Sequence, residues 1–149
     1  MNCRTGVTKS RSIFQMRTHY YPDAMVAERS STRRRVLVVE DDEVSCQALR
    51  ALLNRWGFDS SERMTTADAF EEVRRETPPC ILLDLMMPDM SGLELLKSIR
   101  TRGLATKVVV MTAANDPQMM RALNALHPDA LFHKPLDVAK LKRWLTDNL

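Results

Sequence analysis

The stretch Val36-Leu37-Val38-Val39-Glu40-Asp41-Asp42-Glu43 joins a block of apolar residues directly to a run of acidic ones. A short, continuous apolar block is typical of a strand that is buried on both faces, as in a parallel sheet covered by helices on each side. The acidic run begins where this strand ends, and open parallel sheets bind their ligands at the carboxyl ends of the strands. The stretch therefore predicts both a fold class and the location of a functional site.

Four further strands are predicted along the rest of the chain. Cys80–Leu83 and Val108–Met111 are apolar blocks like the first, whereas Phe58–Arg63 and Ala130–His133 are weaker candidates. Between the strands, apolar residues recur at intervals of three and four, which is typical of the buried face of a helix. The five resulting sets are Cys46, Leu49, Leu53 and Trp56; Ala67, Phe70 and Val73; Leu93, Leu96 and Ile99; Met119, Ala122 and Leu126; and Val138, Leu141 and Leu145. This alternation predicts an α/β domain with a doubly wound, five-stranded parallel sheet.

The positive charge of the chain is concentrated at its N-terminal end. The net charge is +3 over 149 residues, but residues 1–35 carry +6 and residues 36–149 carry −3. Residues 1–34 are rich in Ser, Thr and Arg and show no sustained apolar period, so we expect a disordered basic arm followed by a folded domain at 35–149. A domain that binds nucleic acid through its folded surface would normally carry the basic excess itself.

Several functional classes are excluded by composition. Four glycines leave no phosphate-binding glycine loop, and three cysteines without C-x-x-C spacing form no zinc cluster or disulfide framework. No apolar run approaches the roughly 18 residues that a membrane span requires. We therefore expect a cytoplasmic protein without membrane contact.

Residues with distinctive chemistry follow four of the predicted strands, where parallel strands bring them to one edge of the sheet. They are Glu40 and Asp41, Asp84, Thr112 and Lys134. Carboxylates gathered in a crevice repel one another, and Mg²⁺ bound through one or two carboxylates is the natural remedy. The acidic run alone has a second explanation, because acidic residues also stabilise the first turn of a helix. Asp84 favours a functional site, since an unpaired charge at the end of a buried strand is costly.

Four motifs resemble those of response-regulator receiver domains of two-component signal transduction. They are Val38-Val39-Glu40-Asp41-Asp42, Asp84-Leu85-Met86-Met87-Pro88-Asp89-Met90-Ser91-Gly92, Met111-Thr112-Ala113 and Lys134-Pro135. The resemblance covers residues 35–149 and implies a flavodoxin-like fold with strand order 2-1-3-4-5. It also implies a cis peptide bond between Lys134 and Pro135.

The resemblance implies a phosphorylation site. Asp84 would be the phosphoacceptor, supplied by a sensor histidine kinase or a histidine phosphotransfer protein, while Thr112 and Lys134 would contact the phosphoryl group. Mg²⁺ would be the cofactor, bound directly by Asp41 and Asp84, through water by Glu40, and by the backbone carbonyl of Met86. Such a protein is a signalling phosphoacceptor rather than an enzyme, because it catalyses only its own phosphorylation and dephosphorylation.

Two features depart from or limit the resemblance. Leu131 stands where the family usually has an aromatic switch residue, and Phe132 is expected on the opposite face of its strand. The sequence ends with the last predicted helix, so we expect a stand-alone receiver without a DNA-binding domain. It would signal through an unidentified downstream protein or relay the phosphoryl group.

Two alternatives belong to other functional classes. A Mg²⁺-dependent phosphatase of the haloacid-dehalogenase kind also uses a strand-end Asp, a Thr and a Lys, but it needs a second Asp where this chain has Met86. A binding module that has lost phosphorylation is the other alternative. The complete set of Asp41, Asp84, Thr112 and Lys134 weighs against it, whereas Leu131 favours it.

Overall fold

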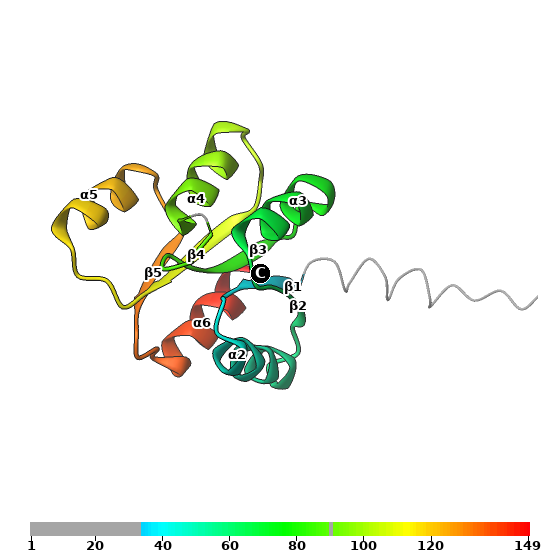
Figure 1. Cartoon of the computed structure of the whole chain (residues 1–149). Helices are drawn as coiled ribbons and strands as arrows, with labels where there is room; N and C mark the ends of the chain where they lie inside the picture. Colours follow the sequence, from blue (N-terminus) through cyan, green and yellow to red (C-terminus); the bar gives the residue numbers. More distant parts are fainter. Residues whose placement is uncertain (1–33, 90) are drawn as a thin grey trace, which may run out of the picture.

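The computed structural model describes residues 34–89 and 91–149 (Figure 1). The expected arm at 1–34 therefore lies outside the described residues except for its last position. The elements are β1 (Arg35–Val39), α2 (Glu43–Arg55), β2 (Asp59–Arg63), α3 (Thr66–Glu76), β3 (Cys80–Asp84), α4 (Gly92–Thr101), β4 (Lys107–Thr112), α5 (Pro117–Ala125), β5 (Ala130–His133) and α6 (Val138–Asn148). Strands and helices alternate as the sequence predicts.

The five strands form one parallel sheet in the order β2-β1-β3-β4-β5, which confirms the expected doubly wound topology. In the pairing register, Val39 lies opposite Leu83, and Asp84 lies opposite Met111. The carboxyl ends of β1, β3 and β4 therefore meet at one edge, which is where the predicted site residues follow their strands.

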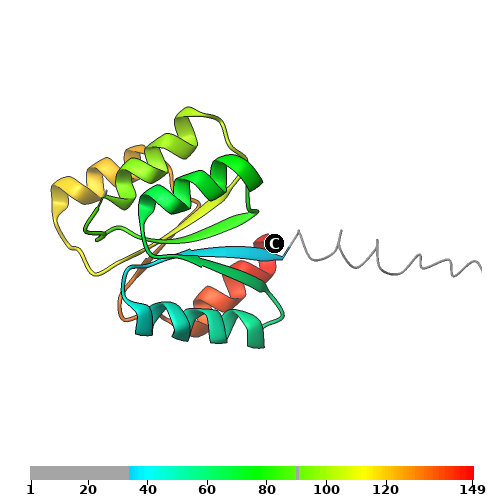
Figure 2. The same ribbon diagram turned by 45° about the vertical axis from the view of Figure 1, so that its right-hand side comes forward.

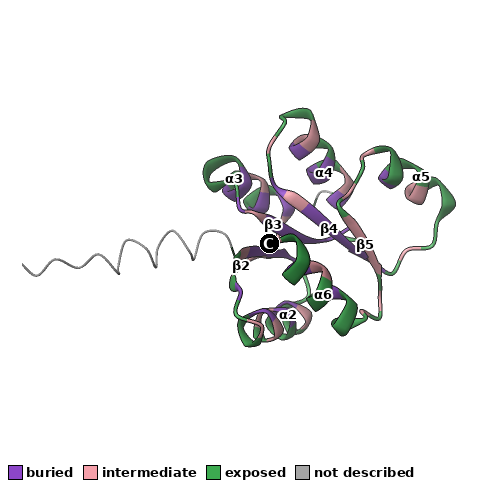
Figure 3. Cartoon of the chain, turned by 180° about the vertical axis from the view of Figure 1, so that it is seen from behind, coloured by how far each residue is buried: buried purple, intermediate pink, exposed green. Residues whose placement is uncertain are grey.

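Helices cover both faces of the sheet (Figures 1 and 2). One face packs against α3, α4 and α5, through buried side chains that include Val73, Ile99 and Leu123. The other packs against α2 and α6, through side chains that include Leu53 and Leu145. Figure 3 shows the result, with buried strands at the centre and helices exposed on their outer sides. Two apolar layers thus fix the sheet from both sides.

Polar side chains begin the helices. The residue before each helix accepts a hydrogen bond from a first-turn N–H group, which has no partner within the helix. These residues are Asp42, Thr65, Ser91, Asp116 and Asp137. After α2, Gly57 adopts a φ of +83°, a left-handed conformation that strains residues with a Cβ atom.

The apolar patterns place most of the predicted helix residues against the core, but Ala67, Ala122 and Val138 are exposed. In α3 the buried residues include Ala69 and Glu72, whereas Ala67 is exposed. In α5 the buried residue is Leu123, and Ala122 is exposed. The burial of Glu72 depends on partners from other elements, and periodicity within one helix carries no information about them.

Candidate phosphoacceptor site

The topology brings the predicted site residues to one edge of the sheet. Glu40 and Asp41 directly follow β1, and Asp84 is the last residue of β3. Thr112 is the last residue of β4, and its carbonyl accepts a hydrogen bond of 2.8 Å from the backbone N–H of Lys134, just after β5. Glu40 and Lys134, which are 94 positions apart in the sequence, are also in contact.

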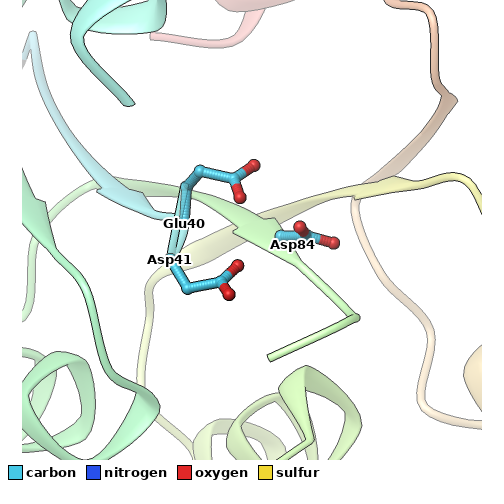
Figure 4. A group of neighbouring side chains, drawn as sticks. All are labelled: Glu40, Asp41 and Asp84. Carbon is cyan, nitrogen blue, oxygen red and sulfur yellow. The ribbon is translucent and has the colours of Figure 1, made fainter. Parts of the chain in front are cut away.

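Three carboxylates form a cluster at this edge (Figure 4). Glu40, Asp41 and Asp84 each offer an oxygen, and these atoms lie within 4.8 Å of one another. Glu40 and Asp84 are only 1% and 5% exposed, whereas Asp41 is open to solvent. Such an oxygen-rich cluster with one solvent-facing side suits Mg²⁺, which keeps several of its water ligands.

The acidic run at 40–43 divides between two roles. Glu40 and Asp41 contribute to the cluster, whereas Asp42 caps α2 by accepting a 2.9 Å hydrogen bond from the backbone N–H of Ser45. Glu43 lies in the first turn of the same helix. Glu40 and Asp41 thus lie where the functional explanation expects them, whereas Asp42 and Glu43 lie where acidic residues stabilise the first turn of a helix.

Lys134 places a positive charge between two of the carboxylates. Its Nζ atom lies 2.8 Å from Oε2 of Glu40 and 3.0 Å from Oδ2 of Asp84. Burial raises the pKa of Glu40, and the negative charge of Asp84 raises it further. The hydrogen bonds that Glu40 accepts from Lys134 and from the backbone N–H of Asp42 oppose this rise in pKa only in part. For Lys134, burial favours the neutral amine, but the hydrogen bonds to Glu40 and Asp84 outweigh it and raise the pKa. Lys134 therefore remains charged at neutral pH.

The second oxygen of Asp84 is also engaged. Oδ1 accepts a 3.0 Å hydrogen bond from the backbone N–H of Met86, so both oxygens have partners and the carboxylate orientation is fixed. Thr112 is fully buried, and its hydroxyl oxygen accepts a 2.9 Å hydrogen bond from the N–H of Ala114. The Lys134–Pro135 peptide bond is cis, as the resemblance implied.

One residue near the site was missed by sequence reasoning. Asp89, on the loop between β3 and α4, accepts hydrogen bonds from the first turn of α3. An Asp after a Pro is a common turn residue, and nothing in the sequence distinguishes this one. Its contacts become visible only when α3 and the loop are placed side by side.

Comparison with known proteins assigns the family. A family model described as the response regulator receiver domain matches residues 36–146. The chain belongs to this family. A solved structure of the signal receiver domain of a putative Luxo repressor protein from Vibrio parahaemolyticus superposes with a TM-score of 0.72 at 28% identity, covering 78% of this chain and 89% of that one.

Two curated relatives of this receiver differ in how much of them it matches. The transcriptional regulatory protein ZraR of Klebsiella oxytoca is 37% identical over 116 residues, which are 76% of this chain but 26% of the relative. Sporulation initiation phosphotransferase F of Bacillus subtilis is 27% identical over 108 residues, which are 72% of this chain and 87% of the relative. The receiver thus spans about a quarter of the first relative and most of the second.

Membership in the family carries a general functional meaning. A receiver domain is a phosphoacceptor module of two-component signalling and implies a histidine kinase or phosphotransfer partner. Within residues 34–89 and 91–149, no helix combines the length and the apolar character that crossing a bilayer requires.

Proposed function

We propose that this receiver accepts a phosphoryl group on Asp84 from the phosphohistidine of a sensor histidine kinase or a histidine phosphotransfer protein. The observation that carries the proposal is the position of Asp84, a nearly buried carboxylate that contacts Lys134 and clusters with Glu40 and Asp41. A carboxylate in this setting serves as a nucleophile in covalent phosphoryl transfer. The protein is then a signalling phosphoacceptor that catalyses only its own phosphorylation and dephosphorylation.

The transfer step follows from the contacts of Asp84. One of its oxygens attacks the phosphorus atom while the bond from phosphorus to the donor imidazole nitrogen breaks, and the electron pair of that bond leaves with the imidazole. The product is an aspartyl phosphate. Lys134, already 3.0 Å from Oδ2, stabilises the negative charge on the phosphoryl oxygens, and the hydroxyl of Thr112 donates a hydrogen bond to one of them.

The acidic cluster supports Mg²⁺ as the cofactor. Asp41 and Asp84 would bind the ion directly, Glu40 would bind it through a water molecule, and Met86 would contribute its backbone carbonyl. When bound, the ion supplies positive charge that offsets the charge of the phosphoryl oxygens. Asp41 is the exposed member of the cluster and leaves room for the water ligands that Mg²⁺ retains.

The output is proposed to pass through a partner, either by phosphorelay or by a change in a surface that a downstream protein recognises. The phosphorelay is favoured by the relative named as a phosphotransferase, of which this receiver covers 87%. We also propose that the protein lies in the cytoplasm, away from membranes.

The phosphorylation itself is directly testable. The protein is incubated with Mg²⁺ and acetyl phosphate and its intact mass is measured; we expect the wild type to gain one phosphoryl group. Asp84→Asn should gain none while keeping the wild-type circular dichroism spectrum, because it removes the nucleophile and preserves the size of the side chain. Asp147→Asn, on the exposed side of α6, is the matched control and should behave as the wild type. An adduct that persists in Asp84→Asn would place the acceptor on another residue.

A further inference from the structure

We propose that Asp89 is a positioning residue for the phosphoacceptor site: it binds the loop between β3 and α4 to the first turn of α3 and so fixes the backbone of Met86 beside Asp84. This inference rests on the proposed function, in which the carbonyl of Met86 is a ligand of Mg²⁺. It concerns a residue outside the acidic cluster that contacts neither the ion nor the phosphoryl group.

Three hydrogen bonds join Asp89 to α3. Its Oδ2 atom accepts from the backbone N–H of Thr66 at 3.1 Å, from the hydroxyl of Thr66 at 3.0 Å and from the backbone N–H of Ala67 at 3.4 Å. First-turn N–H groups have no partner within the helix and carry partial positive charge, so an ionised carboxylate is well suited to them. Thr66 is fully buried, which gives Asp89 a donor in a fixed position.

The same helix start has a second, separate cap. The hydroxyl oxygen of Thr65 accepts a 3.1 Å hydrogen bond from the backbone N–H of Asp68. Thr65 therefore stabilises α3 locally, whereas Asp89 reaches the helix from a loop 22 or more residues further along the chain. A change at Thr65 therefore alters the stability of α3 without removing the attachment of the loop.

The base of the loop is fixed by close backbone packing. The N–H of Gly92 donates to the carbonyl of Leu85 at 3.2 Å, which closes the loop where α4 begins. A Cβ atom on Gly92 would lie 2.5 Å from the carbonyl oxygen of Asp84, so the backbone segments on either side of the loop are in direct contact. Leu85 and Met87 are buried in the core and add to the restraint.

Met86 lies between these restraints but has little packing of its own. The residue is 57% exposed, and its backbone N–H donates to Oδ1 of Asp84. The orientation of its peptide group therefore depends on how firmly the rest of the loop is held. Asp89 fixes the far part of the loop, and without it the loop would sample more conformations, so that a smaller fraction of molecules would present the Met86 carbonyl to a cation.

The inference is tested by Mg²⁺ titration of the full chain, followed by amide NMR. We expect Asp89→Ala to weaken Mg²⁺ binding by about three- to tenfold. Loss of a residue that hydrogen-bonds a metal ligand typically weakens binding by about 10- to 100-fold, so the expected effect is at or below the lower end of that range. Amide hydrogen exchange at Thr66 and Ala67 should accelerate in the same variant. Asp89→Asn keeps an acceptor oxygen and should recover part of the lost affinity.

Thr65→Ala is the matched control, because it removes a cap from the same helix without touching the loop. It should lower the stability of α3 and leave Mg²⁺ affinity at the wild-type value. Wild-type affinity in Asp89→Ala would overturn the inference, and so would an equal loss in Thr65→Ala, which would assign the effect to helix stability. Failure of the wild type to bind Mg²⁺ would overturn the proposed metal site and this inference together, so the two failures are distinguishable.

Discussion

Glu40 is buried beside a second carboxylate, and this environment makes its charge costly. Burial and the charge of Asp84 raise the pKa of Glu40, while the hydrogen bonds from Lys134 and the N–H of Asp42 lower it by less. In the folded protein without a cation, the neutral form of Glu40 is therefore favoured more than in an unfolded chain. Protonated Glu40 therefore adds to the free energy of unfolding below the ordinary Glu pKa of about 4.3. This contribution is lost as the pH rises through the raised pKa of Glu40 in the folded protein.

The raised pKa predicts how Mg²⁺ binding depends on pH. A cation needs the ionised form, so affinity should begin to fall on acidification at a pH above the value of about 4.3 expected for an ordinary Glu. Lys134 does not produce this loss, because its pKa is raised above its ordinary value and it stays charged. In Glu40→Gln the Mg²⁺ affinity should be weaker at neutral pH and should decrease less on acidification than in the wild type.

The measurement is a series of Mg²⁺ titrations at decreasing pH, read by amide NMR. His133 is exposed at the end of β5 and directly precedes Lys134 in the chain. His133→Gln is therefore the control and should keep the wild-type pH dependence. The same pH dependence in the wild type and in Glu40→Gln would contradict the assignment.

At the scale of elements, β2 forms a strand with no apolar side chain. Its residues Asp59–Arg63 pair in parallel register with β1 at the edge of the sheet. On one face, Arg63 contacts Glu72 of α3 at 2.8 Å, and the hydroxyl of Ser61 donates to Glu72 at 2.8 Å. On the other face, Glu62 pairs with Arg50 of α2 at 2.8 Å. Charged contacts thus take the place of apolar packing at this edge.

Glu72 is the centre of these contacts and should contribute strongly to stability. Its side chain is 1% exposed and is also paired with Arg35. Because the two arginines are partly exposed and can regain water, we expect Glu72→Ala to lower the free energy of unfolding by about 2 kcal/mol, less than the 3–5 kcal/mol typical of a fully buried pair. Urea unfolding measures the change.

The neighbouring acidic residue provides the control for this prediction. Glu71 is exposed and pairs with Arg74 within α3, so Glu71→Ala should cost no more than about 0.5 kcal/mol. Equal losses in the two variants would show that burial of Glu72 contributes nothing beyond a surface ion pair.

The polar edge also marks where prediction from sequence stops. The ends of β1, β3 and β4 were predicted within one or two residues, because each strand contains a continuous apolar block whose residues are buried whichever elements cover them. The burial of Glu72 in α3 was not predicted, because Glu72 is buried only together with Arg35 and Arg63 from two other elements. A pattern within one segment carries no information about partners that only the fold supplies.

At the scale of the whole molecule, the candidate site was predictable because topology alone assembles most of it. Parallel strands bring their last residues to one edge, so the positions of Glu40, Asp84, Thr112 and Lys134 follow from the strand ends. Asp89 was not predictable, because its partner Thr66 begins a helix that lies beside the loop only in the folded chain. The site therefore depends on the sheet for its reactive groups and on a helix of one layer for its loop.

Successive side chains of β5 pack on opposite faces of the sheet. Leu131 packs against the core beneath α3, α4 and α5, whereas Phe132 packs against the core beneath α2 and α6. The prediction that Phe132 faces away from Leu131 is thus confirmed. Leu131 pairs with Val110, two residues before Thr112, so it is close in register to the phosphoryl site while carrying no aromatic ring.

This arrangement predicts a confined structural response to phosphorylation. The modification adds about −1.5 to −2 charges, and it shifts a two-state surface only as far as it interacts differently with the two states. Leu131 has no bulky ring to move between exposed and buried positions, so phosphorylation stabilises the state with a buried side chain at this position only slightly. With beryllofluoride as the phosphoryl mimic, we expect amide shifts mostly within residues 112–116 and a wider response in Leu131→Tyr. Phe132→Tyr adds a hydroxyl to a ring on the opposite face and should leave the response unchanged, whereas large wild-type shifts across β5 and residues 140–144 would show that Leu131 suffices as a switch.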